Sequence, residues 1–191
     1  MIRRTLLGAL CLIGLITAVA FASGEAVDLG PLSISLDLSI AGAHSIETEQ
    51  SSELMHNYDR QGSDFQYTIY PATVSYDGSS SKVMIEAHQM SETQKLDDQI
   101  SGKEQISGLE HCIEQSEMMP RRPDYQSEAY TIDGHEGILA TVNTGDANPL
   151  YIAAYSPDES DGSGSIVCVI GSDFPWETTK SIFDSVSAQV K

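Results

Sequence analysis

The 191-residue chain is strongly acidic, with 28 Asp and Glu against 10 Lys and Arg and a formal net charge of −18. Nucleic-acid binding needs clustered basic side chains that contact phosphates, so this charge argues against a nucleic-acid partner and against docking on anionic lipid. The 40% share of hydrophobic residues suffices for the core of one folded domain.

Residues 1–22 are typical of an export signal. Arg3 and Arg4 give a positive start, no charge follows from Leu6 to Ala22, and the stretch ends in the small–x–small sequence Ala20-Phe21-Ala22. Cleavage after Ala22 would take the net charge from −18 to −20, because it removes two arginines and no acid. We therefore expect a secreted or cell-envelope protein. The alternative is an uncleaved segment that anchors the protein in a membrane, since this apolar run approaches the length that spans a bilayer.

The next region, residues 23–64, is predicted to hold one strand and a polar linker. Apolar and polar residues alternate over Leu32–Ile40, which indicates a strand with one buried face. Residues 44–64 are polar and aperiodic, which predicts a loop. We expect the main domain to span residues 65–191.

In the main domain, two strands and a helical region come first. Phe65–Tyr70 alternates in polarity, and Val83–Ala87 follows the turn residues 77–81 as the returning strand of a hairpin. Residues Ser91–Met118 predict a helix that breaks near Ser101, because its two apolar groups lie on different faces. Prolines at 120 and 123 end this region.

The last third predicts four strands and a closing helix. The strands are Glu128–Asp133, Glu136–Asn143, Leu150–Ser156 and Ser165–Gly171. The last of them is apolar on both faces, which is typical of a central strand. Pro175 opens the final helix, whose apolar stripe continues to Val190. The order of elements predicts an α+β fold, an antiparallel sheet covered by helices.

Four features carry a family resemblance: the entering strand Phe65–Tyr70, the long helix after Val83–Ala87, the meander Glu128–Gly171 and the close from Phe174 to Val186. In this order the chain from residue 65 to 191 resembles the PsbP-like α/β/α sandwich. That group includes the accessory protein of photosynthetic oxygen evolution and exported bacterial and archaeal relatives. The resemblance implies an exported accessory or binding domain without catalysis, and it carries over no active-site residue.

Export would leave two cysteines, Cys112 and Cys168. An even count in an oxidising compartment predicts a disulfide between them. The alternative is two buried free thiols, because cysteine is among the most buried residue types. No Lys or Arg flanks either cysteine, and His111 beside Cys112 would point to another side of a helix, so a catalytic thiolate is disfavoured.

Three carboxylates follow one another closely at Asp158, Glu159 and Asp161. Calcium prefers such oxygen ligands, so these residues are the candidate metal ligands. The loop departs from the EF-hand template, because Pro157 stands where the first ligand belongs, and a solvated acidic turn is the alternative. The histidines show no His-x-x-x-His spacing, and the cysteines show no Cys-x-x-Cys spacing, for a transition metal.

Two further acidic groups have functional and structural interpretations. Asp133-Gly134-His135-Glu136 places an acid, an imidazole and another acid at a hairpin tip, where general acid–base chemistry is conceivable and a solvated turn is the alternative. Glu110, Glu114 and Glu117 form a helical stripe. The stripe is either a docking face for a basic partner or cation, or a solvated face.

The sequence thus predicts an exported, non-catalytic accessory or binding domain of the cell envelope or extracellular space. Its partner is an unnamed protein or small ligand, and it meets a membrane only if the N-terminal segment stays uncleaved. The alternatives are a calcium-binding envelope component and a small hydrolase with an unrecognised site. No nucleotide or serine-nucleophile motif is present, and no cofactor other than calcium is expected.

Overall fold

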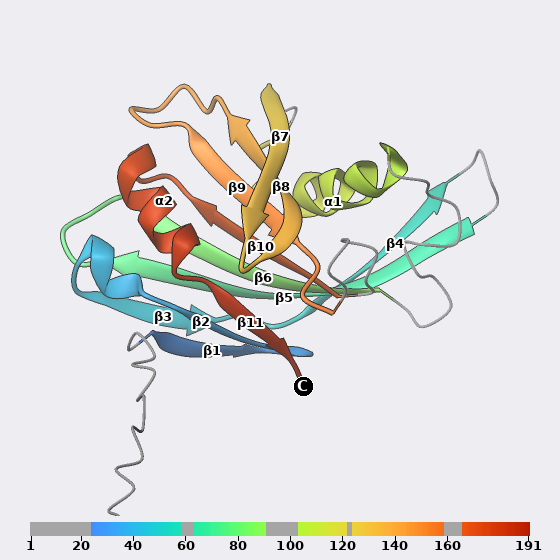
Figure 1. Ribbon diagram of the computed structural model, residues 1–191, viewed down its shortest axis with the longest axis horizontal. Helices are drawn as coiled ribbons and strands as arrows, with labels where there is room; N and C mark the ends of the chain where they lie inside the picture. Colours follow the sequence, from blue (N-terminus) through green and yellow to red (C-terminus); the bar gives the residue numbers. More distant parts are fainter. Residues whose placement is uncertain (1–23, 59–62, 91–102, 122–123, 159–165) are drawn as a thin grey trace, which may run out of the picture.

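The computed structural model describes residues 24–58, 63–90, 103–121, 124–158 and 166–191. These residues form eleven antiparallel strands in two sheets, two α-helices and a short 3-10 helix (Figure 1). The strands are β1 (Glu25–Leu29), β2 (Leu32–Leu36), β3 (His44–Thr48), β4 (Ser52–Tyr58), β5 (Ser63–Tyr76), β6 (Lys82–Met90), β7 (Tyr125–Ile132), β8 (His135–Val142), β9 (Leu150–Tyr155), β10 (Ile166–Ser172) and β11 (Ser187–Val190). The helices are η1 (Leu38–Ala41), α1 (Lys103–Gln115) and α2 (Trp176–Asp184).

The large sheet has the strand order β3-β5-β6-β10-β9-β8-β7, and β4 pairs with β5 as well. Strand β10 lies inside this sheet between β6 and β9 and is buried along its whole length. The prediction of a strand covered on both faces is therefore confirmed for this segment. The predicted hairpin around Gly134 is confirmed too, as β7 and β8.

Alternate residues of the large sheet face two separate hydrophobic cores. Val167 and Val169 of β10 join one core with Ile113 of α1. Cys168 and Ile170 point to the other face and join a core with the small sheet and α2. The small sheet has the order β1-β2-β11 and adds residues such as Leu32, Ile34 and Leu36 to that second core.

The predicted α+β class, with helices covering the sheet as in the PsbP-like sandwich, is wrong. The described chain is mostly β-structure, and three strands from both ends of the chain cover one face of the large sheet together with α2. The C-terminus contributes to this difference in fold class. The apolar stripe predicts a last helix that continues to Val190. Helix α2 ends at Asp184, and residues 187–190 pair with β2 instead. The open edge of β2 thus provides backbone partners that helical periodicity does not reveal.

The loop predicted at residues 44–64 is also wrong where the structure describes it. Strands β3 and β4 fall in this range, and both pair with β5 of the large sheet. Their polar sequence suits a sheet edge, where few side chains need burial. The strand predicted at Leu32–Ile40 ends early, because the Asp37 carboxylate accepts a hydrogen bond from the Ser39 N–H and starts η1. The predicted signal at residues 1–22 and the first part of the predicted long helix lie outside the described residues.

Besides the shared core, specific contacts near β1 attach the small sheet to the large one. The turn between β1 and β2 rests on the ring of Tyr70, and His44 of β3 reaches Glu25 of β1. The His44 Nε2 atom lies 3.1 Å from the Glu25 carboxylate, and its Nδ1 atom lies 3.0 Å from the Gly42 carbonyl oxygen. Both partners are acceptors, so only the protonated imidazole donates to both. The Gly42 carbonyl and then the Glu25 carboxylate raise the pKa of His44 against the opposing effect of burial.

The contact with Tyr70 predicts different costs for two glycine-to-alanine substitutions. Gly30 and Gly78 both have positive φ, at 50° and 72°, so alanine is strained at either position. A Cβ atom at Gly30 would also lie 2.6 Å from the Tyr70 ring, whereas nothing lies within 4 Å of one at Gly78. We expect Gly30→Ala to lower the free energy of unfolding by about 1–3 kcal/mol more than Gly78→Ala, as for other overpacked sites. Urea unfolding followed by circular dichroism measures both, and equal losses would contradict the packing on Tyr70.

Candidate functional site

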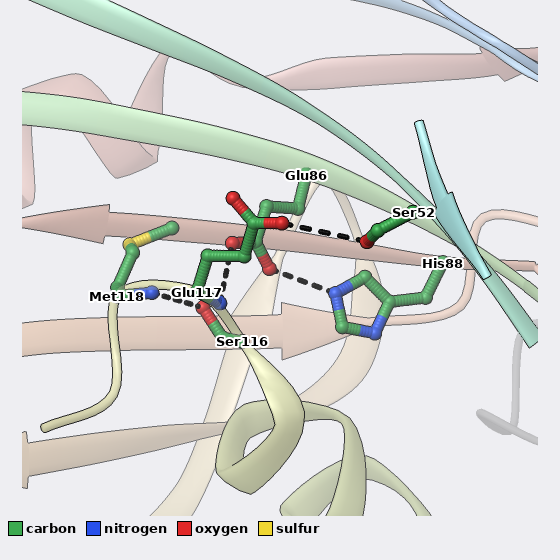
Figure 2. Close-up of polar contacts among 6 residues, drawn as sticks. All are labelled: Ser52, Glu86, His88, Ser116, Glu117 and Met118. Carbon is green, nitrogen blue, oxygen red and sulfur yellow. Dashed lines mark hydrogen bonds and ion pairs between the residues drawn. The ribbon is translucent and has the colours of Figure 1, made fainter. Parts of the chain in front are cut away.

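A glutamate and a histidine are buried together inside the large sheet, beneath the end of α1 (Figure 2). Glu86 and His88 lie two residues apart on β6, so both side chains point to the same face of the sheet. Both residues are 0% exposed, and the His88 Nε2 atom lies 2.8 Å from the Glu86 Oε2 atom. Burying such groups is costly unless they are paired and hydrogen-bonded, which marks this pair as the most unusual polar feature of the described core.

The second oxygen of Glu86 holds the chain where it leaves α1. The Glu117 N–H donates to Glu86 Oε1 at 2.9 Å, and the Met118 N–H donates to Ser116 Oγ at 3.2 Å. The Met118 side chain then packs on β10 at Gly171, where a Cβ atom would lie 1.9 Å from the Met118 sulfur. Both carboxylate oxygens of Glu86 are therefore engaged, one by an imidazole and one by the turn after the helix.

The side chain of Glu117 lies at the rim of this arrangement. It accepts a hydrogen bond from Ser52 Oγ at 3.4 Å (Figure 2). Partial burial, followed by the charges of Glu86 and Glu49, raises the pKa of Glu117, although the Ser52 hydroxyl and His88 act in the opposite direction. The segment that follows α1 is thus hydrogen-bonded to Glu86 of β6 in the core and to Ser52 of β4 near the surface.

A carboxylate–imidazole pair can act as a general acid and base, but only where a substrate can reach it. Glu86 and His88 are fully enclosed, so they contact no substrate in this conformation. The nearby thiol of Cys112 is a poor nucleophile as well, because burial, and then the charge of Glu86, raise its pKa to about 12. In this structure the Glu86–His88 pair positions the end of α1.

The sequence patterns described above do not reveal this pair. Neither metal-ligand spacing nor the hairpin tip at His135 points to His88, and the predicted strand ends at Ala87. A glutamate followed two residues later by a histidine, within an otherwise apolar strand, indicates two polar groups on one buried face. That signal was present at positions 86 and 88.

The hairpin tip considered for acid–base chemistry has a structural role. Asp133 accepts hydrogen bonds at Oδ2 from the Ala188 N–H at 2.8 Å and from the Tyr155 hydroxyl at 3.2 Å. The ring of His135 lies 5.6 Å from the ring of Tyr155. Asp133 therefore ties β11 of the small sheet to the large sheet, and its carboxylate is committed to that contact.

The predicted calcium ligands are described only in part. Asp158 accepts a hydrogen bond from Ser156 Oγ at 2.7 Å, whereas Glu159 and Asp161 lie outside the described residues. Among the residues that the structure describes, no three His, Cys, Asp or Glu side chains are placed to hold a metal. The calcium site stays a prediction.

The predicted disulfide between Cys112 and Cys168 is not formed, and both thiols are free and buried. Cys112 belongs to the core between α1 and the large sheet, and Cys168 belongs to the core on the other face. The sheet therefore separates the two sulfur atoms. The alternative of two buried free thiols is the arrangement that the structure shows.

The acidic stripe on α1 divides into two parts. Glu110 and Glu114 accept hydrogen bonds from Ser127 and Tyr125 of β7, the latter at 2.7 Å. Glu117 lies beyond the end of the helix, near Ser52. Two of the three predicted stripe residues thus line the junction between α1 and β7, the strand at one end of the large sheet.

No family model, no curated protein and no solved structure matches this chain. The resemblance to the PsbP-like group therefore stays a prediction from the sequence. Within the described ranges, neither α-helix is long and apolar enough to cross a membrane.

We expect substitutions of Glu86 and His88 to have non-additive effects on the free energy of unfolding. His88→Leu leaves a buried carboxylate without its imidazole, and we expect a loss of about 3 kcal/mol in the free energy of unfolding. Adding Glu86→Gln removes the buried charge and keeps an acceptor for the Glu117 N–H, so the double variant should recover about 1–2 kcal/mol of that loss. Urea unfolding of both variants and the wild type measures the difference. A double variant less stable than His88→Leu would contradict this account.

Because both thiols are buried, we expect the folded protein to protect them from alkylation. Burial raises the pKa of Cys112 to about 12 and raises the pKa of Cys168, so neither forms a thiolate near neutral pH. We expect iodoacetamide at pH 8 to label neither cysteine in the folded protein and both after denaturation without reductant. Mass-spectrometric mapping of the labelled peptides reads this out. A Cys112–Cys168 cross-linked peptide would be the contrary result.

Proposed function

We propose that the protein is an exported, non-catalytic binding domain that engages a positively charged protein segment at one edge of its large sheet. The observation that carries this proposal is the outermost strand, β7, which is exposed and flanked by carboxylates on both faces. We use the name acidic edge for the strand β7, which carries Glu128, together with the neighbouring residues Glu110, Glu114 and Asp184. The export part of the proposal is supported by the signal-like sequence of residues 1–22.

Strand β7 ends the large sheet within the described parts of the chain, where its paired neighbour is β8. Gln126 to Ala129 are exposed along it. Edge strands present backbone donors and acceptors to their surroundings, which makes them common interaction sites. The strand therefore offers a surface on which a partner can dock.

The carboxylates of the acidic edge lie on both sides of β7. Tyr125 and Ser127 point toward α1, where they meet Glu114 and Glu110. Successive strand residues alternate, so Glu128 and Tyr130 point the other way. Tyr130 packs against Phe183 of α2, near Asp184, whose carboxylate forms an ion pair with Lys180. A basic segment along β7 would thus meet Glu110 and Glu114 on one face and Glu128 on the other.

The burial and hydrogen bonding of the acid–base groups support binding better than catalysis. Glu86 and His88 are enclosed, and the Asp133 carboxylate holds β11. The net charge of −18 repels anions and other copies of this chain and attracts cationic partners. The calcium-binding and hydrolase alternatives stay predictions.

Octalysine is a direct probe of this proposal. We expect it to bind the protein at low ionic strength, where charge attraction is least screened. Glu110→Gln with Glu114→Gln should weaken binding about 2- to 30-fold, since two exposed ion pairs together contribute roughly 0.4–2 kcal/mol. Glutamine keeps an acceptor for Tyr125 and Ser127, so the fold should be retained.

The matched control removes two exposed carboxylates elsewhere, with Glu47→Gln on β3 and Asp77→Asn in the turn before β6. This variant has the same net charge, and its affinity for octalysine should change less than twofold. Isothermal titration calorimetry measures both variants. Equal losses in the two variants, or no binding of octalysine to the wild type, would refute the proposed site.

A further inference from the structure

We propose that the partner adds an extended, basic segment as a new strand on the outer edge of β7. This inference rests on the proposed function, because it concerns the same acidic edge, and it specifies how the partner binds. Backbone hydrogen bonds would then provide part of the affinity, and the flanking carboxylates would select the charge of the segment.

The backbone of β7 is regular over its whole length. All eight residues, from Tyr125 to Ile132, pair in continuous register with β8, from Val142 to His135. In an antiparallel ladder, alternate residues direct their N–H and C=O groups to one side, and the remaining residues direct theirs to the other. Half of the β7 residues therefore point their backbone groups away from β8, toward the outer edge.

Most protein edges carry features that block strand addition, such as proline, lysine, a bulge or a very short strand. The sequence of β7, Tyr-Gln-Ser-Glu-Ala-Tyr-Thr-Ile, contains neither proline nor lysine, and its register shows no bulge. Negative charge is the protecting feature that remains. It opposes pairing between two copies of this chain, because Glu110, Glu114 and Glu128 of both copies would approach one another, but it attracts a basic segment.

The spacing of the α1 carboxylates fits the repeat of a strand. Glu110 and Glu114 are four residues apart on a helix, a rise of about 6 Å. Alternate residues of a strand are about 6.8 Å apart. The structure shows this match directly, because Tyr125 and Ser127, two residues apart on β7, bond to Glu114 and Glu110 respectively.

A strand added to β7 would run about 4.8 Å further out and repeat the same spacing. Lysine or arginine at alternate positions of that strand would point toward Glu110 and Glu114, each of which has a second carboxylate oxygen. The other positions would lie on the face of Glu128 and Asp184. The segment that fits best is therefore extended, with basic residues at every second position and residues of high strand propensity between them.

The test uses the peptide (Lys-Thr)4 and two forms of it that carry backbone N-methyl groups, either on all lysines or on all threonines. N-methylation removes the N–H donors of one edge of the peptide and leaves its charge unchanged. We expect one methylated form to bind at least tenfold more weakly than the unmodified peptide, because its blocked edge is the one that faces β7. Titration calorimetry of the three peptides against the intact protein measures this.

Amide hydrogen exchange locates the contact. Bound (Lys-Thr)4 should slow exchange at alternate residues of β7, and it should leave β3 at the far end of the large sheet unchanged. Equal affinity of all three peptides would refute strand addition, and it would leave the proposed function intact if Glu110→Gln with Glu114→Gln still weakens binding. Absence of binding by both (Lys-Thr)4 and octalysine would refute both proposals. Slowed exchange in α1 without slowed exchange in β7 would also refute strand addition.

Discussion

The structure depends on one constraint, the burial of β10 on both faces. Every residue of this strand is buried, and its alternate side chains enter two different cores. Water must therefore be excluded from both sides of the large sheet. Helix α1 does so on one side, and α2 with the small sheet does so on the other (Figure 1). The two cysteines cannot meet for the same reason, because the covered sheet lies between them.

The buried Glu86–His88 pair connects this core to the proposed binding surface. Glu86 fixes the turn after α1 through the Glu117 N–H (Figure 2), and Met118 packs on β10 at Gly171. The described end of α1 is thereby held at a defined place on the sheet. Its acidic residues Glu110 and Glu114 consequently reach the hydroxyls of β7. A polar group deep in the protein thus helps to place the charges of the acidic edge.

Local patterns predicted most of the large sheet well. The strands expected at Glu128–Asp133, Glu136–Asn143, Leu150–Ser156 and Ser165–Gly171 each match an observed strand within a few residues. Pro175 immediately precedes the final helix, as predicted. Of the small sheet, the alternation predicted only the strand at β2, because β11 pairs with it from the opposite end of the chain and such pairing leaves no local period. The Glu86–His88 pair was not predicted, because the strand was expected to end at Ala87.

Composition and short-range alternation are enough to predict the acidic charge, the antiparallel meander and the central place of β10, because these patterns involve only neighbouring residues. Helical spacing also predicts Glu110 and Glu114 as acids on one face. The groups that those acids contact, the end strand that is open and the separation of the cysteines become evident only in the folded chain. These outcomes depend on the packing of segments far apart in the chain, and β11 shows this most clearly, since its four residues become a strand through their pairing with β2.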